Sequence, residues 1–243
     1  MARNFTMEDV PLLYEDNHLL VVLKPFNMPS QEDKTGDADL LTLLKGYVKE
    51  KYNKEGDAYV GLVHRLDRVT GGIMVFAKTS KAAARLSQSF ATHEIDKGYL
   101  AVLCGQPYQP QGQIVSYLKK NPLTNTVFVA TESTAGAKKA VLDYKILDKK
   151  QDLSLAEISL ETGRSHQIRV QFASFGNPVY GDVRYGGNKG SPAGNNLALF
   201  AYRLIFNHPV SDKRMVFVAY PPQTNPWNLF EINNYIDYFH AGE

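Results

Sequence analysis

The chain of 243 residues contains a single cysteine, Cys104, and no long apolar run. One cysteine excludes an intrachain disulfide and a thiolate zinc cluster, and it suits a reducing compartment such as the cytoplasm. A membrane-spanning helix needs roughly 18 consecutive apolar residues, and a signal peptide needs an apolar segment where this N-terminus is acidic. The sequence therefore predicts neither export nor membrane spanning.

Cofactor signatures are scarce as well. The patterns GxGxxG and GxxxxGK[ST], which cradle dinucleotides and phosphates, do not occur. The six histidines are scattered without the spacing of metal ligands. The net charge is only +2, which is too small to indicate a polyanionic partner by itself, although a near-neutral total can hide a basic face. We therefore expect neither a metal nor an organic cofactor.

The composition is that of a folded globular protein, with 44% hydrophobic and 21% charged residues. A chain of this length commonly folds as one unit, so residues 1–243 are predicted to form a single domain. Several predicted strands follow one another without a helix between them. This favours an α+β fold with a mixed, largely antiparallel central sheet flanked by helices and loops. The expected strands are 19–25, 72–78, 97–105, 140–147, 153–161, 197–206 and 215–220, and the expected helices are 39–53, 79–94 and one that begins near 165.

Helix boundaries are marked by residues that favour helix ends. Asp39 is expected to cap the first helix, and the second is expected to start at Thr79 or Ser80. Ser165 is expected to cap the third helix, which Gly176 then stops. Two polar loops are expected at 26–39 and 181–196, and the second is either a functional loop or a flexible insertion.

The stretch HRLDR places one carboxylate, Asp67, between Arg65 and Arg68, with His64 ahead of them. Such a triplet on its own is more often an exposed ion pair that contributes little to stability. Here the stretch enters a tight turn before the strand predicted at 72–78, and loops carried by rigid strands are frequent places for catalytic groups. From the residues alone, both interpretations stay open.

Two further stretches carry functional candidates. Arg164, His166 and Arg169 are expected near the N-terminal end of the third helix, where backbone N–H groups and the helix dipole favour an anion. Basic residues are unfavourable for the dipole at that end, so their presence hints at a function. Tyr99 alternates with Ala101 on a predicted strand, where core packing is the usual role of such a ring.

Together these stretches resemble the RluA-type pseudouridine synthase family. The order and spacing of four motifs match the family: YEDNHLLVVLKP at 14–25, HRLDRVTGGIMVFAK at 64–78, KGYLAV at 97–102 and TGRSHQIRVQFASFGNPVYGDVRYG at 162–186. The resemblance implies an enzyme that converts specific uridines in tRNA or ribosomal RNA to pseudouridine, with no metal and no organic cofactor. It also implies a mixed sheet core.

The resemblance further implies roles for individual residues. Asp67 falls on the family's catalytic aspartate, Tyr99 on its active-site tyrosine, and Arg169 on the arginine that pairs with the catalytic carboxylate. Arg65 falls on the arginine that enters the space left by the flipped-out nucleotide. The residues predicted to assist substrate binding are His64, Arg68, Arg164 and His166.

The chemistry agrees with a single carboxylate. Isomerisation of uridine breaks the N1–C1′ bond, turns the uracil and rejoins it through C5. A carboxylate such as Asp67 can attack C1′ or C6, or remove the C2′ proton, and the sequence leaves these three routes open. The base must first leave the RNA stack, at a cost on the order of a few kcal/mol, and a planar arginine such as Arg65 can fill the gap. A tyrosine such as Tyr99 can stack on the uracil, and its hydroxyl can help the C5 proton to leave.

Three departures from the family pattern stand out. Gly71 occupies a position where the family often has serine, and SQED follows KPFNMP where many members have a Val-His-Pro type sequence. Only 13 residues precede the first motif, so the S4-type RNA-binding domain of many relatives is expected to be absent.

A monomer is expected. The alternatives are a noncatalytic RNA-binding protein that retains the synthase fold, and a nucleoside glycosidase that releases free base.

Overall fold

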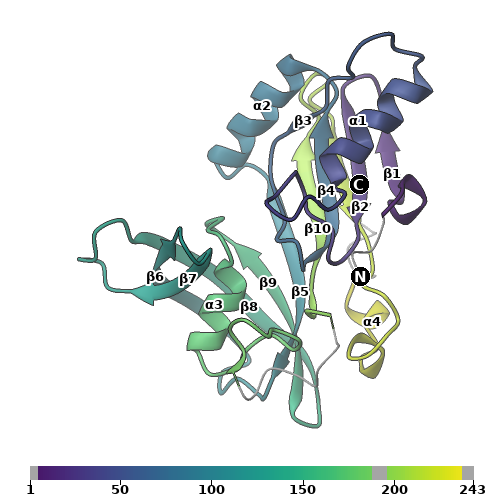
Figure 1. Ribbon diagram of the computed structural model, residues 1–243. Helices are drawn as coiled ribbons and strands as arrows, with labels where there is room; N and C mark the ends of the chain where they lie inside the picture. Colours follow the sequence, from purple (N-terminus) through teal and green to yellow (C-terminus); the bar gives the residue numbers. More distant parts are fainter. Residues whose placement is uncertain (1–4, 188–195, 237–243) are drawn as a thin grey trace. The chain divides into compact units, whose positions relative to one another are not determined.

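The computed structural model describes residues 5–187 and 196–236, and the chain forms two compact units (Figure 1). The first takes in Met1–Lys97 and Ala201–Ala219, and the second Gly98–Phe200 and Tyr220–Glu243. Both contain helices and antiparallel strand pairs, so the predicted α+β class is confirmed. The assignment of the whole chain to a single domain stays a prediction.

The first unit is built on antiparallel strands. They follow the order β1-β2-β4-β10, while β3 pairs with β4 and β11 pairs with β10. The pairing of β2 with β4 places Lys24 opposite Gly72, four residues after the end of the HRLDR stretch. The strands of this unit are β1 (Leu12–Glu15), β2 (Leu19–Lys24), β3 (Gly61–Leu62), β4 (Gly71–Ala77), β10 (Leu199–Asn207, which starts in the second unit) and β11 (Arg214–Val218).

Two α-helices, α1 (Leu40–Lys51) and α2 (Ser80–Ala91), follow a short 3-10 helix, η1 (Met7–Asp9). The Asp39 side chain accepts the backbone N–H of Thr42 at 3.0 Å, and the Thr79 hydroxyl accepts that of Ala82 at 3.2 Å. The caps expected at Asp39 and Thr79 are therefore confirmed.

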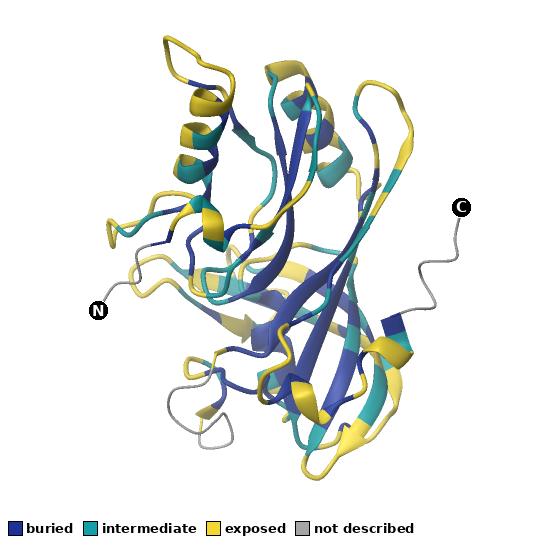
Figure 2. Ribbon diagram, turned by 90° about the vertical axis from the view of Figure 1, so that its right-hand side faces the viewer, coloured by how far each residue is buried: buried dark blue, intermediate teal, exposed yellow. Residues whose placement is uncertain are grey.

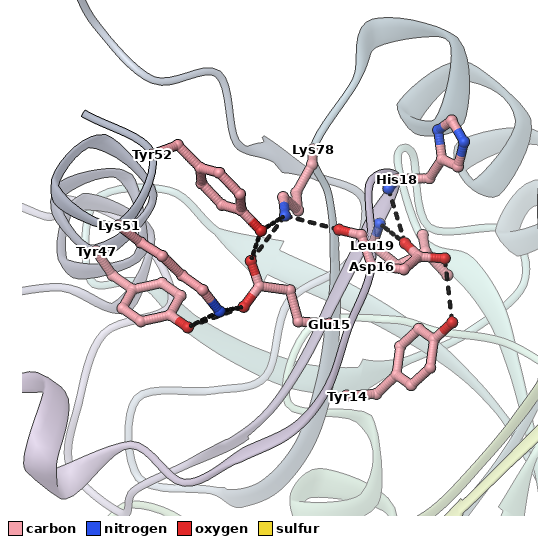
Figure 3. A network of polar contacts seen from close by, with 9 residues as sticks. All are labelled: Tyr14, Glu15, Asp16, His18, Leu19, Tyr47, Lys51, Tyr52 and Lys78. Atoms are coloured by element: carbon pink, nitrogen blue, oxygen red, sulfur yellow. Dashed lines mark hydrogen bonds and ion pairs between the residues drawn. The ribbon is translucent and has the colours of Figure 1, made fainter. Parts of the chain in front are cut away.

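A polar cluster around Glu15 fastens α1 to the strands (Figure 3). The Glu15 carboxylate accepts hydrogen bonds from Tyr47 at 2.8 Å, Lys51 at 2.6 Å, Tyr52 at 2.8 Å and Lys78 at 2.7 Å. Burial alone would raise the pKa of Glu15, but these four donors outweigh it and lower the pKa to about 2. One carboxylate therefore joins the end of β1, the C-terminal turn of α1 and the residue after β4.

Strand β4 is buried along its whole length (Figure 2). At its start, Gly72 has a φ of +129°, and a Cβ there would lie 2.4 Å from the carbonyl oxygen of Ala201 in β10. Only glycine fits this close approach of two backbones. The start of β4, just after the HRLDR turn, is therefore in close backbone contact with β10.

The second unit contains five strands in the order β5-β9-β8-β6-β7, and neighbouring strands pair antiparallel. Helix α3 (Gln167–Ser174) packs on this sheet through Val170, which joins Leu118, Val127 and Ala140 in an apolar cluster. The remaining elements are β5 (Asp96–Cys104, which starts in the first unit), β6 (Gln111–Asn121), β7 (Thr126–Ala130), β8 (Lys138–Lys150), β9 (Leu153–Leu160), η3 (Trp227–Leu229) and α4 (Asn233–Ile236).

Four strands were not predicted from the sequence: β1, β3, β6 and β7. In β6 and β7 the buried positions are few, because Val115, Phe128 and Val129 are exposed while Leu118 and Val127 are buried. Apolar residues on both faces hide the period of two that marks a half-buried strand.

Within residues 5–187 and 196–236, every helix is too short or too polar to cross a membrane.

Candidate active site

The HRLDR stretch forms a tight loop in the first unit, between β3 and β4. Thr70 donates its backbone N–H to the carbonyl of Asp67 at 2.9 Å, which closes the turn. Leu66 is buried, and the Ser30 hydroxyl bonds both to its carbonyl at 2.8 Å and to its N–H at 3.3 Å. Arg65 is exposed and Asp67 half-buried. The loop therefore presents a fixed carboxylate beside an exposed guanidinium.

A buried cation lies beside this loop. Lys24 is 1% exposed, and its ammonium donates to the carbonyls of Pro25 at 2.9 Å, Met28 at 2.7 Å and Arg68 at 3.0 Å. Burial lowers the pKa of Lys24 to about 7, and the charge of the Asp67 carboxylate works against that shift. Lys24 thus contributes positive charge to the surroundings of Asp67. Sequence reasoning missed it, although a lysine that ends an apolar strand just before a proline is a visible signal.

His64 is placed for packing. Its Nε2 accepts the backbone N–H of Val75 at 3.0 Å, and its ring stacks on Phe90 with 4.5 Å between centroids. Burial lowers the pKa of His64 to about 3, and the charge of Lys97 lowers it further. A neutral imidazole therefore supports the start of the loop, and its predicted part in substrate binding stays a prediction.

Arg68 reaches across to the loop predicted at 26–39. Its guanidinium donates to the carbonyl of Asn27 at 3.2 Å and to the Thr35 hydroxyl at 2.9 Å, and it forms an ion pair with Asp37. Asp33 lies 3.5 Å away. The hydrogen bond from Arg68 is the main cause that lowers the pKa of Asp37. The side chain after Asp67 is thus tied to another loop.

Gly71, where the family often has serine, has a local explanation. A Cβ at this position would lie 2.8 Å from the ring of Phe26. The Phe26 ring fills the space that a side chain would need, so glycine and phenylalanine fit each other here.

In the second unit, Tyr99 lies on β5 as predicted, opposite Ile158 of β9 and 8% exposed. Arg169 is on α3, also buried, and it makes a bidentate contact with Asp182: Nε and Nη2 lie 2.8 Å and 2.9 Å from the two carboxylate oxygens. Its guanidinium carbon is 5.0 Å from the centroid of the Tyr185 ring. These contacts fix the plane of the Arg169 guanidinium.

Asp182 and Tyr185, the two residues that contact the Arg169 guanidinium, were not predicted from the sequence. Asp182 also accepts the backbone N–H of Arg184 and of Tyr185, each at 3.1 Å, which folds the start of the loop predicted at 181–196 against Arg169. Residues 188–195 of that loop lie outside the described part of the chain. An aspartate followed three residues later by a tyrosine was too weak a signal to reveal this role.

The other basic residues near α3 have separate partners. Arg164 donates through Nε to the carbonyl of Lys139 at 2.9 Å, and His166 Nδ1 lies 2.6 Å from the Tyr185 hydroxyl. That hydroxyl also accepts the backbone N–H of Val127 at 3.0 Å. His166 and Tyr185 therefore connect the start of α3 to β7.

The expected cap at Ser165 was wrong by one residue. The N-cap is His166, in the left-handed region with φ of 51° and without a side-chain cap bond. The turn is closed instead by Gln167, whose side-chain oxygen accepts the Arg164 N–H at 3.0 Å and the Thr162 hydroxyl at 2.8 Å. A side chain that folds back from the first helical residue has replaced the usual cap.

The structure thus groups the predicted residues in two sets. His64, Arg65, Asp67 and Arg68 share one loop of the first unit, whereas Tyr99, Arg164, His166 and Arg169 belong to the second. In the described ranges, no three histidine, cysteine or acidic side chains gather as a metal site would require.

The fold and these residues define a class of protein. A family model described as RNA pseudouridylate synthase matches residues 18–174, a span that includes most of the residues above. The chain belongs to this family, and it is an RNA pseudouridine synthase, an isomerase.

Individual relatives cover most of the chain. Ribosomal large subunit pseudouridine synthase D of Zymomonas mobilis subsp. mobilis is 37% identical over 227 residues, which are 89% of this chain and 71% of that protein. An uncharacterized RNA pseudouridine synthase of Bacillus subtilis, YhcT, is 36% identical over 217 residues, which are 87% of this chain and 68% of that protein. The solved structure of human RNA pseudouridylate synthase domain containing 1 has a TM-score of 0.74 at 20% identity, covers 99% of this chain and 98% of its own, and supports the fold alone.

Proposed function

We propose that this chain isomerises specific uridines in structured ribosomal RNA or tRNA, with Asp67 as the catalytic carboxylate. The loop around Asp67 carries the proposal. Both sequence neighbours of Asp67 are held by hydrogen bonds, through Ser30 on one side and Lys24 on the other, and the buried Lys24 adds positive charge nearby. A charged carboxylate on a rigid loop is what each of the three routes requires.

The reaction needs one group that first adds to the nucleotide or takes its proton and later reverses that step. Asp67 either attacks C1′ or C6, or removes the C2′ proton, as the N1–C1′ bond breaks. The uracil then turns and the C5–C1′ bond forms, as the bond to Asp67 breaks or the C2′ proton is returned. The C5 proton leaves to solvent, and N1 takes up one proton in exchange. No oxidant, reductant or water is consumed, so the atoms of uridine and pseudouridine balance.

Other roles follow from the family resemblance. Tyr99 stacks on the uracil, and Arg169 pairs with the catalytic carboxylate, a role that suits a guanidinium held in one plane by Asp182. Arg65 fills the gap left by the flipped base, for which its exposure on the loop is suitable. The other residues assigned to substrate binding are His64, Arg164 and His166, whereas Arg68 contributes through the loop that it holds.

Relatives indicate the substrate class to test first. Several proteins similar to this chain are named ribosomal large subunit pseudouridine synthases, so ribosomal RNA is the leading candidate and tRNA the second. The enzyme is proposed to act as a monomer without a cofactor. Its single cysteine fits work in the cytoplasm.

The test is tritium release from RNA labelled at C5 of uridine. Purified protein should release tritium from ribosomal RNA or tRNA, and Asp67→Asn should abolish release because the amide cannot act as nucleophile or base, while RNA binding changes little. Asp57→Asn, which changes an exposed aspartate before β3, is the control.

Three results would contradict the proposal. Near-normal turnover by Asp67→Asn would show that Asp67 is not the catalytic carboxylate. RNA binding by the wild-type protein without tritium release indicates a noncatalytic RNA-binding protein. Release of free uracil, instead of formation of pseudouridine with the same mass as uridine, would indicate a glycosidase.

A further inference from the structure

Asp67 is held through its neighbours by one other segment of the chain. On one side, Leu66 bonds through its backbone to Ser30. On the other, the Arg68 carbonyl accepts the Lys24 ammonium, and the Arg68 side chain bonds to Asn27 and beyond. Every one of these partners lies between residues 24 and 37. The position of the Asp67 carboxylate therefore depends on how that segment is folded.

The segment has a buried and an exposed part. Lys24, Met28 and Ser30 are buried, and they form the part of the segment that packs in the protein interior. Residues 31–36 are exposed. The Arg68 guanidinium contacts Asp33 and Thr35 in this part, and it pairs with the half-buried Asp37 that follows it. Arg68 thus spans from the catalytic loop to the outer end of the segment.

These contacts bear on what Arg68 can do. Two carboxylates, a hydroxyl and a backbone carbonyl face its guanidinium, so its charge is balanced within the protein. An RNA phosphate would have to compete with Asp33 and Asp37 for the same donors. The pair with Asp37 is only partly exposed, at 36% for the arginine and 19% for the aspartate, so water screens it less than a fully exposed pair.

We propose that Arg68 is a positioning residue for Asp67: it ties the catalytic loop to segment 33–37 and does not itself contact RNA phosphate. The inference rests on the proposed role of Asp67. If it holds, loss of the tie moves the carboxylate and slows the chemical step, while the affinity for RNA is retained. A direct phosphate contact would do the reverse.

The experiment compares single-turnover rate constants and RNA dissociation constants for Arg68→Gln, Asp37→Asn and the double variant. We expect each single change to slow turnover roughly 10-fold with the dissociation constant within about two-fold of wild type. The double variant should be no slower than the slower single variant, because both changes remove one tie. Arg68→Lys keeps the ion pair but loses the fork of donors, so an intermediate rate is expected.

Arg85→Gln is the matched control, since it removes one positive charge from an exposed arginine on α2 without touching the loop. Thermal melting establishes that each variant is folded. If Arg68→Gln fails to fold, Asp37→Asn and Arg68→Lys decide the matter.

Two outcomes overturn the inference while the proposed function survives: wild-type rates in all the variants, or RNA binding weakened at least roughly 10-fold at an unchanged rate, which would make Arg68 a phosphate contact. Lack of turnover in the wild-type protein would overturn the proposed function itself.

Discussion

Lys24 is a lysine whose three ammonium protons match three backbone carbonyls, those of Pro25, Met28 and Arg68. Buried lysines are rare because the charge loses its water, and this one keeps a carboxylate within electrostatic reach. The Lys24 side chain therefore does two things: it donates to backbone carbonyls beside the HRLDR loop, and it places positive charge near Asp67.

We predict that Lys24→Met slows single turnover at least roughly 10-fold, since the thioether offers neither the charge nor the donors. The three carbonyls would lose their donor, so the free energy of unfolding should fall as well. Rates and urea unfolding curves measure the two effects. Lys45→Met, at an exposed position of α1, serves as control. A Lys24→Met variant with normal turnover would show that the charge near Asp67 is dispensable.

At the scale of elements, the Glu15 cluster shows how one side chain can hold a helix against a sheet. Its four donors come from the C-terminal part of α1, the residue after that helix, and the residue after β4. Because the pKa of Glu15 is about 2 in the folded protein and 4.5 ordinarily, the charged carboxylate stabilises the fold above pH 4.5. This stabilisation is lost as the pH falls from 4.5 towards 2.

Glu15→Gln should therefore lower the free energy of unfolding by roughly 2 kcal/mol at neutral pH, a value reduced for the exposed part of the cluster. The gap between wild type and variant should narrow as the pH falls below 4.5, the ordinary pKa of the group. Urea unfolding at a series of pH values measures it, with Glu50→Gln on the exposed face of α1 as control. A gap that stays constant with pH would show that packing, and not charge, is what the variant loses.

Elements with local signals could be predicted, and those that depend on distant contacts could not. The caps at Asp39 and Thr79 are readable because donor and acceptor lie three residues apart. The cap of α3 was misplaced because the side chain of Gln167 bonds back to residues before the helix. The hairpin of β6 and β7 was missed because exposed apolar residues blur its pattern.

The same limit applies to the candidate site. Asp67, Tyr99 and Arg169 stand in motifs that the sequence displays in order, so their roles could be predicted without a structure, and these roles stay predictions. Lys24 bonds to Arg68, which lies far along the chain. Asp182 bonds to Arg169, and the two meet only once the chain has folded. No local pattern encodes such pairs.

For the whole molecule, Lys24 predicts that stability and activity respond to pH in opposite directions. Its pKa is about 7 when folded and 10.5 ordinarily, so between these values the unfolded chain binds more protons. The contribution of Lys24 to the free energy of unfolding should therefore rise with pH in this window. Turnover should fall as the pH rises through about 7, because the folded protein then loses the positive charge of Lys24 near Asp67.

Urea unfolding and single-turnover rates, measured from about pH 6.5 to about pH 9, test this prediction. Lys24→Met is the control, since it has no proton to lose and should lack both trends. If activity and stability rise together in the wild-type protein, Lys24 is not the group that governs its alkaline behaviour.

The contact between Gly71 and Phe26 matters for anyone who wishes to retarget this enzyme by transplanting loops. A Cβ at position 71 would run into the Phe26 ring. A loop 26–39 taken from a relative with serine at position 71 would bring a residue at position 26 that is fitted to serine and not to glycine. Loop 26–39 and residue 71 are separate in sequence but packed together, so both should be exchanged at once.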